Sequence, residues 1–172
     1  YFKILLFETE RLTDLTTDLL TLNEFDTKSL LLDITTFDIH SVIKNTADSF
    51  EGTCEEKHIS IELSFTTKTL LVKADKRKIQ QVLYNLLDNA IKYSDKKIEI
   101  SFEKNVLTIK NDGKTIPAKQ LKRVFERFYQ TDKTAEGSGL GLSIAKAVAD
   151  RNGWELSADS DKTSTTFRLY LS

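Results

Sequence analysis

The stretch Asn85-Leu86-Leu87-Asp88-Asn89-Ala90-Ile91-Lys92-Tyr93 combines an apolar helical stripe with a polar face. The apolar residues around it recur at the spacing of a buried helix stripe. They are Ile79, Val82, Leu83, Leu86, Leu87 and Ala90. Asn85, Asn89 and Lys92 follow i, i+4, i+7 spacing, so they share a sector turned away from that stripe. Asparagine disfavours helix interiors, because its amide competes for the backbone, so the two carboxamides indicate a ligand. A solvated helix face is the alternative.

The chemistry of this face suits a metal-bound phosphate. Side-chain carbonyls of Asn are neutral oxygen ligands, and Mg²⁺ takes only one or two protein oxygens when phosphate and water fill its remaining positions. Lys92 supplies a mobile point charge for a phosphate. Tyr93 adds a flat ring that can lie against a base.

A second segment, Gly137-Ser138-Gly139-Leu140-Gly141-Leu142-Ser143, leads into the helical periodicity of Ile144, Val148 and Ala149. Glycines let a backbone approach an anion, and the unpaired amides and the dipole at a helix start favour its charge. The segment therefore predicts a phosphate-binding loop that opens a helix. Taken alone, three glycines also fit a hinge or a tight turn.

Between these two segments lies a short β-branched run, Val106 to Ile109, followed by the turn-rich sequence Lys110-Asn111-Asp112-Gly113-Lys114-Thr115-Ile116-Pro117. The pattern predicts a strand that ends in a turn. A side chain at such a strand end is held rigidly enough to read the edge of a base.

Together these segments resemble the histidine-kinase-type ATP-binding domain of the GHKL superfamily, which also contains DNA gyrase, Hsp90 and MutL. The helix of residues 85–93 resembles the N box, residues 111–116 the G1 box, residues 124–129 the F box, and residues 137–142 the G2 box. Four motifs in the family's order make coincidence a poor explanation. The resemblance implies an α/β fold: a two-layer sandwich (the Bergerat ATP-binding fold) in which helices cover one face of a mixed β-sheet, preceded by a long N-terminal helix.

The resemblance also implies roles for individual residues, with ATP (or ADP) and Mg²⁺ as cofactors. Asn89 would ligate Mg²⁺, and Asn85 would support the metal or the phosphates. Lys92 would contact the phosphate chain, and Tyr93 would pack on adenine. Asn85 and Lys92 are thus the expected catalytic residues. The remaining expected nucleotide contacts are Asn111, Gly113, Ile116, Phe125, Arg127, Phe128, Gly137, Gly139, Leu140, Gly141, Leu142 and Thr165.

Within that set, Asn111 and Gly113 would contact adenine, and the G2 glycines would frame the phosphates and hinge a lid over residues 130–136. Phe125 and Phe128 would anchor the lid, and Arg127 would reach the phosphates. Each assignment follows from the resemblance alone.

Several positions depart from the family's pattern. Asn111 stands where Asp is usual, and its carboxamide can accept from an exocyclic amine and donate to a ring nitrogen, without a charge-assisted bond. Asp112 is one residue away, so in an extended segment it points to the other face. Thr115 replaces a frequent glycine and Gln130 a frequent arginine, and the G3 region around Thr165 keeps hydroxyls but not its glycine. We expect these changes to weaken nucleotide binding at worst.

The residue one turn before the expected metal ligand separates the chemistries of the superfamily. Its hydrolases carry Glu there, whereas this chain has Asn85. A carboxamide has no usable basicity near neutral pH, so Asn85 argues against an efficient ATPase and for phosphoryl transfer to a nucleophile. Two alternatives stay open: a nucleotide-binding interaction module without phosphotransfer, and a GHKL-type ATPase or serine kinase.

Neither histidine of the chain has the sequence around it that a phosphoacceptor requires. His40 and His58 both lack the following acidic residue, basic residue and proline. We therefore expect the acceptor histidine on a hairpin helix that these 172 residues do not include, and a response regulator as the onward partner.

Leucines at positions 5, 12, 15, 19 and 22 keep a heptad pattern, interrupted by Glu8. Residues 1–34 thus resemble the second helix of a dimerisation and phosphotransfer hairpin plus a linker, and residues 35–172 the catalytic domain. This predicts a homodimer of the full-length protein. The alternative is an amphipathic helix that folds back on its own domain.

Global composition limits the partners and the compartment that we expect for the chain. The net charge is −1 without a basic block, which argues against nucleic acid as a partner. Cys54 is the single cysteine, typical of a structural thiol in a reducing compartment. No apolar run approaches the ~20 residues of a membrane span. We expect a cytoplasmic domain, from a parent that is a membrane-bound bacterial sensor.

Periodicity and turn residues predict the order of the elements. The expected helices cover residues 2–23, 41–57, 76–93 and 140–152, with Asp75 as the N-cap of the third. The expected strands cover residues 36–39, 59–65, 70–73, 97–103, 106–110, 154–158 and 165–171.

Overall fold

The computed structural model describes residues 9, 13, 16, 20, 32–130 and 138–172. The described elements, in chain order, are β1 (Ile34–Asp38), α2 (Ile39–Asp48), α3 (Glu51–Lys57), β2 (Ser60–Ser64), β3 (Leu71–Asp75), α4 (Lys76–Tyr93), β4 (Lys97–Glu103), β5 (Val106–Asp112), α5 (Ala118–Leu121), α6 (Gly141–Arg151), β6 (Glu155–Ser160) and β7 (Ser164–Tyr170).

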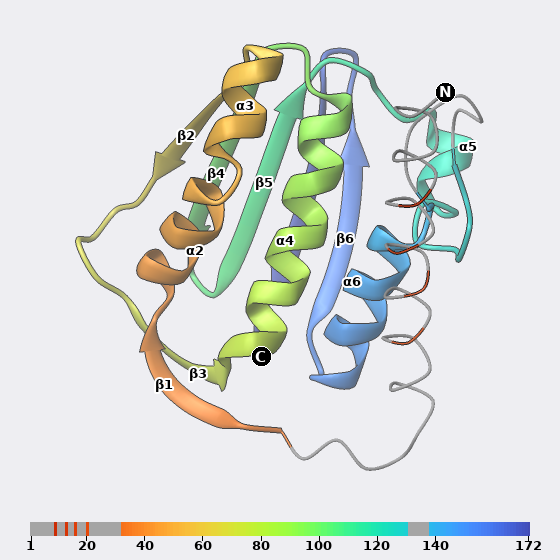
Figure 1. Ribbon diagram of the computed structural model, residues 1–172. Helices are drawn as coiled ribbons and strands as arrows, with labels where there is room; N and C mark the ends of the chain where they lie inside the picture. The colour runs from red at the N-terminus through yellow and green to blue at the C-terminus, as the bar shows by residue number, and fades with distance from the viewer. Residues whose placement is uncertain (1–8, 10–12, 14–15, 17–19, 21–31, 131–137) are drawn as a thin grey trace.

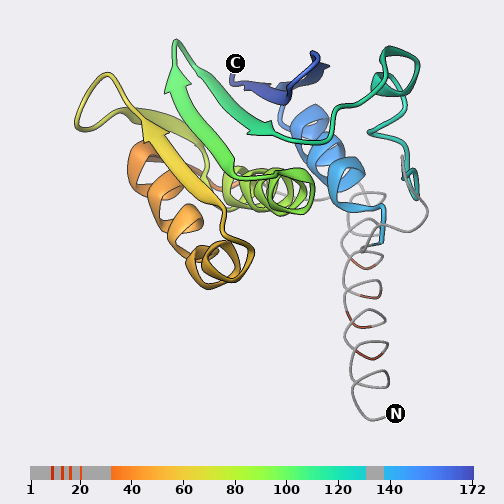
Figure 2. The same ribbon diagram turned by 90° about the horizontal axis from the view of Figure 1, so that it is seen from above.

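A five-stranded sheet in the order β2-β4-β5-β7-β6 forms one layer (Figure 1). Strands β2 and β4 are parallel, and the other neighbours are antiparallel, so the sheet is mixed. Helices α2, α3, α4 and α6 lie together on one face of it, as the view from above shows (Figure 2). The predicted α/β sandwich is therefore confirmed.

Helix α4 is the central element of the helical layer. The Asp75 carboxylate caps its start by accepting from the backbone amides of Arg77 and Lys78, at 3.1 and 3.2 Å, as the sequence predicted. Every residue of the predicted apolar stripe is buried, and Ile91 joins it. Burying that stripe against the sheet removes a large apolar surface from water, and this fixes which face of α4 points outward.

Strand β5 carries its side chains alternately to the two faces of the sheet. Leu107, Ile109 and Asn111 are buried on the helix side, whereas Lys110 is exposed on the other side. Asn111 pairs with Ile98 of β4 and with Thr165 of β7. The last inward-facing position of a central strand is therefore a carboxamide instead of an apolar side chain.

One sequence-based prediction needs correction, and one strand pairing had not been predicted. The helix expected over residues 41–57 is two helices, because the chain turns at Ser49 and Phe50 so that the Phe50 ring is buried and contacts Tyr84 of α4 at 4.8 Å between ring centroids. Strands β1 and β3 pair only with each other, as a separate two-stranded antiparallel sheet. Register between distant segments decides such pairing, and local periodicity carries no information about it.

Some predictions fall outside the described residues. They are most of the helix over residues 2–23, most of the proposed hairpin and linker over 1–34, the lid beyond Gln130, and Gly137. The boundary expected between residues 34 and 35 therefore stays a prediction. None of the helices in the described part of the chain is both long and apolar enough to cross a membrane.

Candidate functional site

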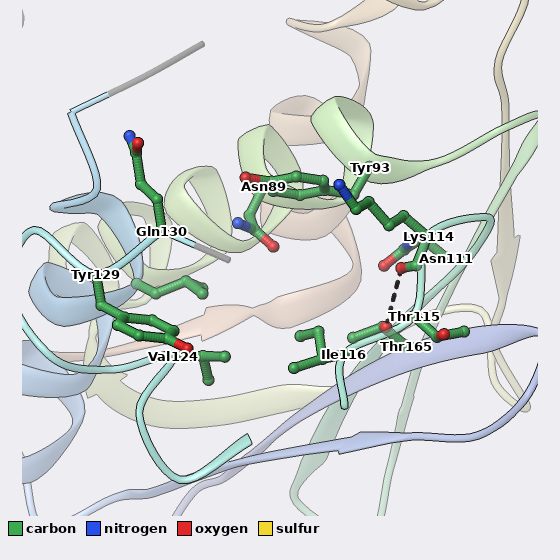
Figure 3. Close-up of a pocket in the computed structure, with 11 residues that line it drawn as sticks. Asn89, Tyr93, Asn111, Lys114, Thr115, Ile116, Val124, Tyr129, Gln130 and Thr165 are labelled. Atoms are coloured by element: carbon green, nitrogen blue, oxygen red, sulfur yellow. Dashed lines mark hydrogen bonds between the residues drawn. The ribbon is translucent and has the colours of Figure 1, made fainter. Parts of the chain in front are cut away.

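A pocket lies where the C-terminal half of α4, the end of β5 and the start of α6 meet (Figure 3). Its volume is about 470 Å³, including the solvent-open mouth. The lining residues are Asn89, Tyr93, Asn111, Lys114, Thr115, Ile116, Val124, Tyr129, Gln130, Leu142 and Thr165. Six of them were predicted site residues: Asn89, Tyr93, Asn111, Ile116, Leu142 and Thr165.

Only part of the polar face of α4 lines this pocket. Asn89 and Tyr93, one turn apart, line the pocket. Asn85 is turned toward α6: its Nδ2 donates to the Gln81 carbonyl at 2.8 Å, and its Oδ1 lies 3.2 Å from where a Cβ on Gly141 would be. Lys92 does not line the pocket, and its ammonium donates to Asp88 Oδ2 at 2.6 Å.

Asn111 presents an acceptor to the pocket. Its Nδ2 donates to the Asp112 carbonyl at 2.9 Å, so the carboxamide is oriented with Oδ1 as the group available to a ligand. Only 1% of Asn111 is exposed, which gives its bonds a low-dielectric setting. The site can therefore accept a hydrogen bond from an exocyclic amine at this position.

Asp112 points away from the pocket, as its one-residue offset predicted. Its Oδ1 accepts from the Ser94 hydroxyl at 2.7 Å and from the amides of Asp95, Lys96 and Lys97 at 3.1, 3.0 and 2.9 Å. Partial burial alone would raise the pKa of Asp112, but these donors outweigh it and lower the pKa to about 2. The carboxylate ties the end of β5 to the α4–β4 connection and is structural.

Gly113 forms the turn that closes β5 onto the end of α4. Its φ is +98°, and a Cβ there would lie 2.6 Å from the Tyr93 carbonyl oxygen and 2.8 Å from the Asp95 nitrogen. The next residue, Lys114, donates its amide to the same Tyr93 oxygen at 3.1 Å. Only glycine combines this φ with this closeness of two backbones.

Hydroxyl groups of the β6–β7 hairpin hold the segment that follows the turn at Gly113. Ser160 Oγ accepts from the Ile116 amide at 2.9 Å and lies 2.9 Å from Thr165 Oγ1. Thr165 is buried in the pocket wall, directly across from Asn111 in the β5–β7 register. The hydroxyls of Ser160 and Thr165 thus hold residues 114–116, which follow the strand end that carries Asn111.

The far wall of the pocket is formed by Val124 and Tyr129 of the F-box region and by the following residue, Gln130. Phe125 packs edge-on against the buried Phe167, with ring centroids 6.4 Å apart, whereas 58% of Phe128 is exposed. Phe128 is linked to Gly139 through its backbone, because its amide donates to the Gly139 carbonyl at 3.0 Å. Arg127 is exposed and is not among the described residues that line the pocket.

Helix α6 begins at the pocket without a side-chain cap. Gly139, at φ +72°, lies against the Phe128 backbone, and Leu140 is fully buried in the core, so the two residues anchor the loop from both sides. Gly141 starts the helix, and Leu142 lines the pocket. Uncapped first-turn amides and the helix dipole make this end suitable for an anion.

The sequence interpretation did not assign site roles to five lining residues. Thr115 and Gln130 were noted only as departures from the family's pattern, and Val124 and Tyr129 only as parts of the F box. Lys114 had no role, although its position directly after the obligatory Gly113 was a usable signal, because that turn fixes where its side chain starts.

Residues 74–172 match the family described as "Histidine kinase-, DNA gyrase B-, and HSP90-like ATPase", which is more than half of the chain. The chain belongs to this family. A histidine kinase-, gyrase B- and HSP90-like domain implies ATP binding, so this is an ATP-binding domain.

Relatives of this ATPase-family chain are sensor histidine kinases. It is 36% identical over 177 residues to "Sensor histidine kinase WalK" of Bacillus subtilis, an alignment that covers 94% of this chain and 29% of that protein. Its fold matches the Acinetobacter baumannii histidine kinase AdeS with a TM-score of 0.84, at 29% identity, over 99% of this chain and 83% of that one.

A third match is the histidine kinase ThkA, solved in complex with the response regulator protein TrrA. The TM-score is 0.76 at 26% identity, and the match covers 94% of this chain and 48% of that one. The ATPase-family chain thus spans only about a third of the curated relatives it matches, with 29%, 30% and 35% for the first three.

Proposed function

We propose that this chain is the ATP-binding catalytic part of a two-component sensor histidine kinase. It binds Mg-ATP and transfers the γ-phosphate to a histidine on a hairpin helix, from which the phosphate passes to a response regulator. The observation that supports this most is the joint lining of one pocket by Asn89 and Tyr93 of α4 and Asn111 of β5, beside the uncapped start of α6.

In this proposal the nucleotide base lies at the β5 end of the pocket. Asn111 Oδ1 accepts from the exocyclic amine of adenine, Tyr93 and Ile116 pack against the ring, and Thr165 supports Asn111 from the neighbouring strand. The phosphates extend toward Asn89 and the start of α6, where Gly139, Gly141 and Leu142 bring backbone amides close.

The residues at the phosphate end fit Mg²⁺ held mainly by the nucleotide. No group of three or more His, Cys, Asp or Glu side chains that could hold a metal occurs among the described residues. Asn89 offers one neutral oxygen at the pocket wall, which matches the one or two protein ligands that Mg²⁺ takes beside phosphate and water. Bound there, Mg²⁺ would supply neutralisation of phosphate charge.

The chain itself contributes positioning and charge neutralisation. Asn85 offers no general base for water, and its amide is engaged with the Gln81 carbonyl, so hydrolysis is disfavoured relative to transfer. Lys92 can contact a phosphate only after it exchanges Asp88 for that phosphate. Transfer then depends on a nucleophile brought to the pocket by another segment.

Neither histidine of this chain suits the role of acceptor. His40 is buried, with 4% of its surface exposed, and stacks on Phe65 at 4.0 Å between ring centroids. His58 ends α3 in a left-handed backbone conformation. The proposal therefore includes a separate hairpin helix that carries the acceptor, a homodimer, a response regulator and a membrane-bound parent, all by family resemblance.

Phosphate transfer tests the proposal directly. The chain is mixed with the hairpin of its parent protein, γ-labelled ATP and Mg²⁺, and the product is treated with acid or base. Label on the hairpin that acid removes and base leaves in place supports histidine phosphorylation. Acid-stable label, or rapid release of free phosphate without labelled protein, contradicts it.

A further inference from the structure

Tyr129 lines the pocket, and a cation lies over its aromatic ring. Figure 3 shows the ring extending from the far wall into the pocket, on the same side as Val124. The guanidinium carbon of Arg123 lies 4.5 Å from the centroid of this ring. A cation within about 6 Å of a ring centroid is attracted by the negative face of the ring. Arg123 therefore interacts with a side chain that a ligand in the pocket meets.

The backbone brings Arg123 to Tyr129 through two consecutive turns. The amide of Glu126 donates to the Arg123 carbonyl at 2.9 Å, and the amide of Tyr129 donates to the Glu126 carbonyl at 3.3 Å. Turns of this kind place side chains that are three residues apart near one another. The two contacts of the Arg123 guanidinium, one with Glu126 and one with Tyr129, follow that spacing.

Glu126 sets the direction of the guanidinium. Arg123 Nε donates to both carboxylate oxygens of Glu126, at 3.3 and 3.1 Å. Both side chains are about half exposed, at 56% and 52%, so the ion pair itself contributes little free energy. Its consequence is geometric, because a planar guanidinium held at Nε is less free to turn away from the ring.

The main chain before Tyr129 is held from the other side. Phe128 has a left-handed φ of +61°, and its amide donates to the Gly139 carbonyl at 3.0 Å. A bulky residue adopts such a φ only where its surroundings impose it. This fixes where the Tyr129 side chain starts but leaves its rotamer open, and the contact with Arg123 restricts the rotamer.

We propose that Arg123 is a positioning residue for nucleotide binding: its guanidinium, oriented by Glu126, holds the Tyr129 ring in place as part of the pocket wall. Arg123 acts through the ring, since it is not among the described residues that line the pocket. A ring that is already held in place loses less freedom when the nucleotide binds. This inference rests on the proposed function, because it assumes that the pocket holds MgATP.

Calorimetric titration of the 172-residue chain with MgATP tests the inference in two double-mutant cycles. One combines Arg123→Ala with Tyr129→Ala, which removes the ring, and the other combines it with Tyr129→Phe, which keeps the ring. Arg123→Lys retains a cation. Lys122→Ala is the matched control, because Lys122 is an exposed cation next to Arg123 in the chain, at the C-cap of α5. Thermal unfolding checks that each variant is folded.

We expect Arg123→Ala to weaken MgATP binding about threefold, which is the size of one exposed cation–π contact. The same substitution should have the same effect beside Tyr129→Phe and no effect beside Tyr129→Ala. Arg123→Lys should lose less affinity than Arg123→Ala, and Lys122→Ala should bind MgATP like the wild type.

A loss from Arg123→Ala that persists beside Tyr129→Ala would mean that Arg123 acts without the ring, and it would overturn the inference. The inference is also overturned if Lys122→Ala loses as much affinity as Arg123→Ala, if Arg123→Lys does, or if Arg123→Ala loses none. These single-variant comparisons decide the question if Tyr129→Ala does not fold. A wild-type chain that does not bind MgATP overturns the proposed function and this inference together, whereas wild-type binding with an unaffected Arg123→Ala overturns this inference alone.

Discussion

Asn85 and Gly141 lie against each other where α4 meets the start of α6, with Asn85 Oδ1 only 3.2 Å from the position a Cβ on residue 141 would take. The hydrogen bond from Asn85 Nδ2 to the Gln81 carbonyl holds the carboxamide in that orientation. Asn85 thus helps to set how closely the phosphate-binding loop approaches α4. A longer carboxylate side chain at position 85 would not fit this arrangement unchanged.

Gly141→Ala should lower the free energy of unfolding by about 1 kcal/mol, because the added methyl overpacks the contact with Asn85. In an Asn85→Ala background the same change should cost nothing, which gives a coupling energy of about 1 kcal/mol in a double-mutant cycle. Chemical denaturation of the four proteins measures it. Gly52→Ala is the control, since a Cβ there meets nothing within 4 Å; it should stabilise α3 equally in both backgrounds. If the effects of Gly141→Ala and Asn85→Ala on the free energy of unfolding are additive, the two residues are not in energetic contact and the prediction is wrong.

Asn89→Ala should abolish Mg²⁺-dependent nucleotide binding while leaving the fold intact, because Asn89 lies at the pocket wall and not in the apolar core. Titration of MgATP, with and without chelator, checks it. Asn45→Ala removes an equally helical asparagine from the exposed side of α2 and should bind normally. Unchanged affinity in Asn89→Ala would remove Asn89 from the proposed metal site.

Gly113→Ala should destabilise the protein by more than about 2 kcal/mol, since its Cβ would overlap the Tyr93 carbonyl and the φ of +98° is strained for alanine. Thermal unfolding measures the loss. Gly153→Ala serves as comparison, because its φ of +73° is also left-handed but its Cβ would meet nothing closer than 3.9 Å. If both substitutions cost the same, backbone strain alone explains the effect and the close approach to α4 is irrelevant.

Asp112 should make stability depend on acid pH. Its pKa is about 2 in the folded chain and near 3.8 for a free side chain, so its contribution is fully present above about pH 4 and is lost as the pH falls toward 2. Asp112→Asn removes the charged acceptor to which the Ser94 hydroxyl and the amides of residues 95–97 donate. The variant should therefore have a flatter stability curve between these pH values. Urea unfolding at a series of pH values checks it. A variant that keeps the wild-type slope would assign the acid dependence to other carboxylates.

His40→Phe should raise stability by about 1 kcal/mol. Both ring nitrogens of His40 are buried without a hydrogen-bond partner, and a phenyl ring of similar shape removes that cost while keeping the stack on Phe65. Differential scanning calorimetry measures the change. Phe65→Ala, which removes the other half of the stack, should act in the opposite direction. A less stable His40→Phe would mean that His40 has a role the ring stack does not explain.

Much of the helical layer and of the sheet could be predicted from local patterns. The α4 stripe, its Asp75 cap and the strand before Asn111 each depend on residues within a few positions of one another, so periodicity and capping were sufficient. The break at Phe50 could not be predicted in that way, because it depends on contact with Tyr84 in another helix.

The candidate site, too, could be predicted from the sequence only in part. Spacing alone grouped Asn85, Asn89 and Lys92, and the packing of α6 on α4 and an ion pair within α4 separated them. Asn85 is directed to Gly141, and Lys92 is paired with Asp88 four residues back, a pairing that i,i+4 spacing could have suggested. Lys114 entered the site because a turn at Gly113 closes β5 onto Tyr93.

The sequence by itself determined the class of fold, the family and the motifs that form the pocket, because hydrophobic period, caps and glycine positions act within single elements. Tertiary structure alone decided which polar side chains face the pocket and which serve the framework. Those choices depend on strand register, on the approach of one helix to another, and on distances of a few ångströms between residues far apart in the chain.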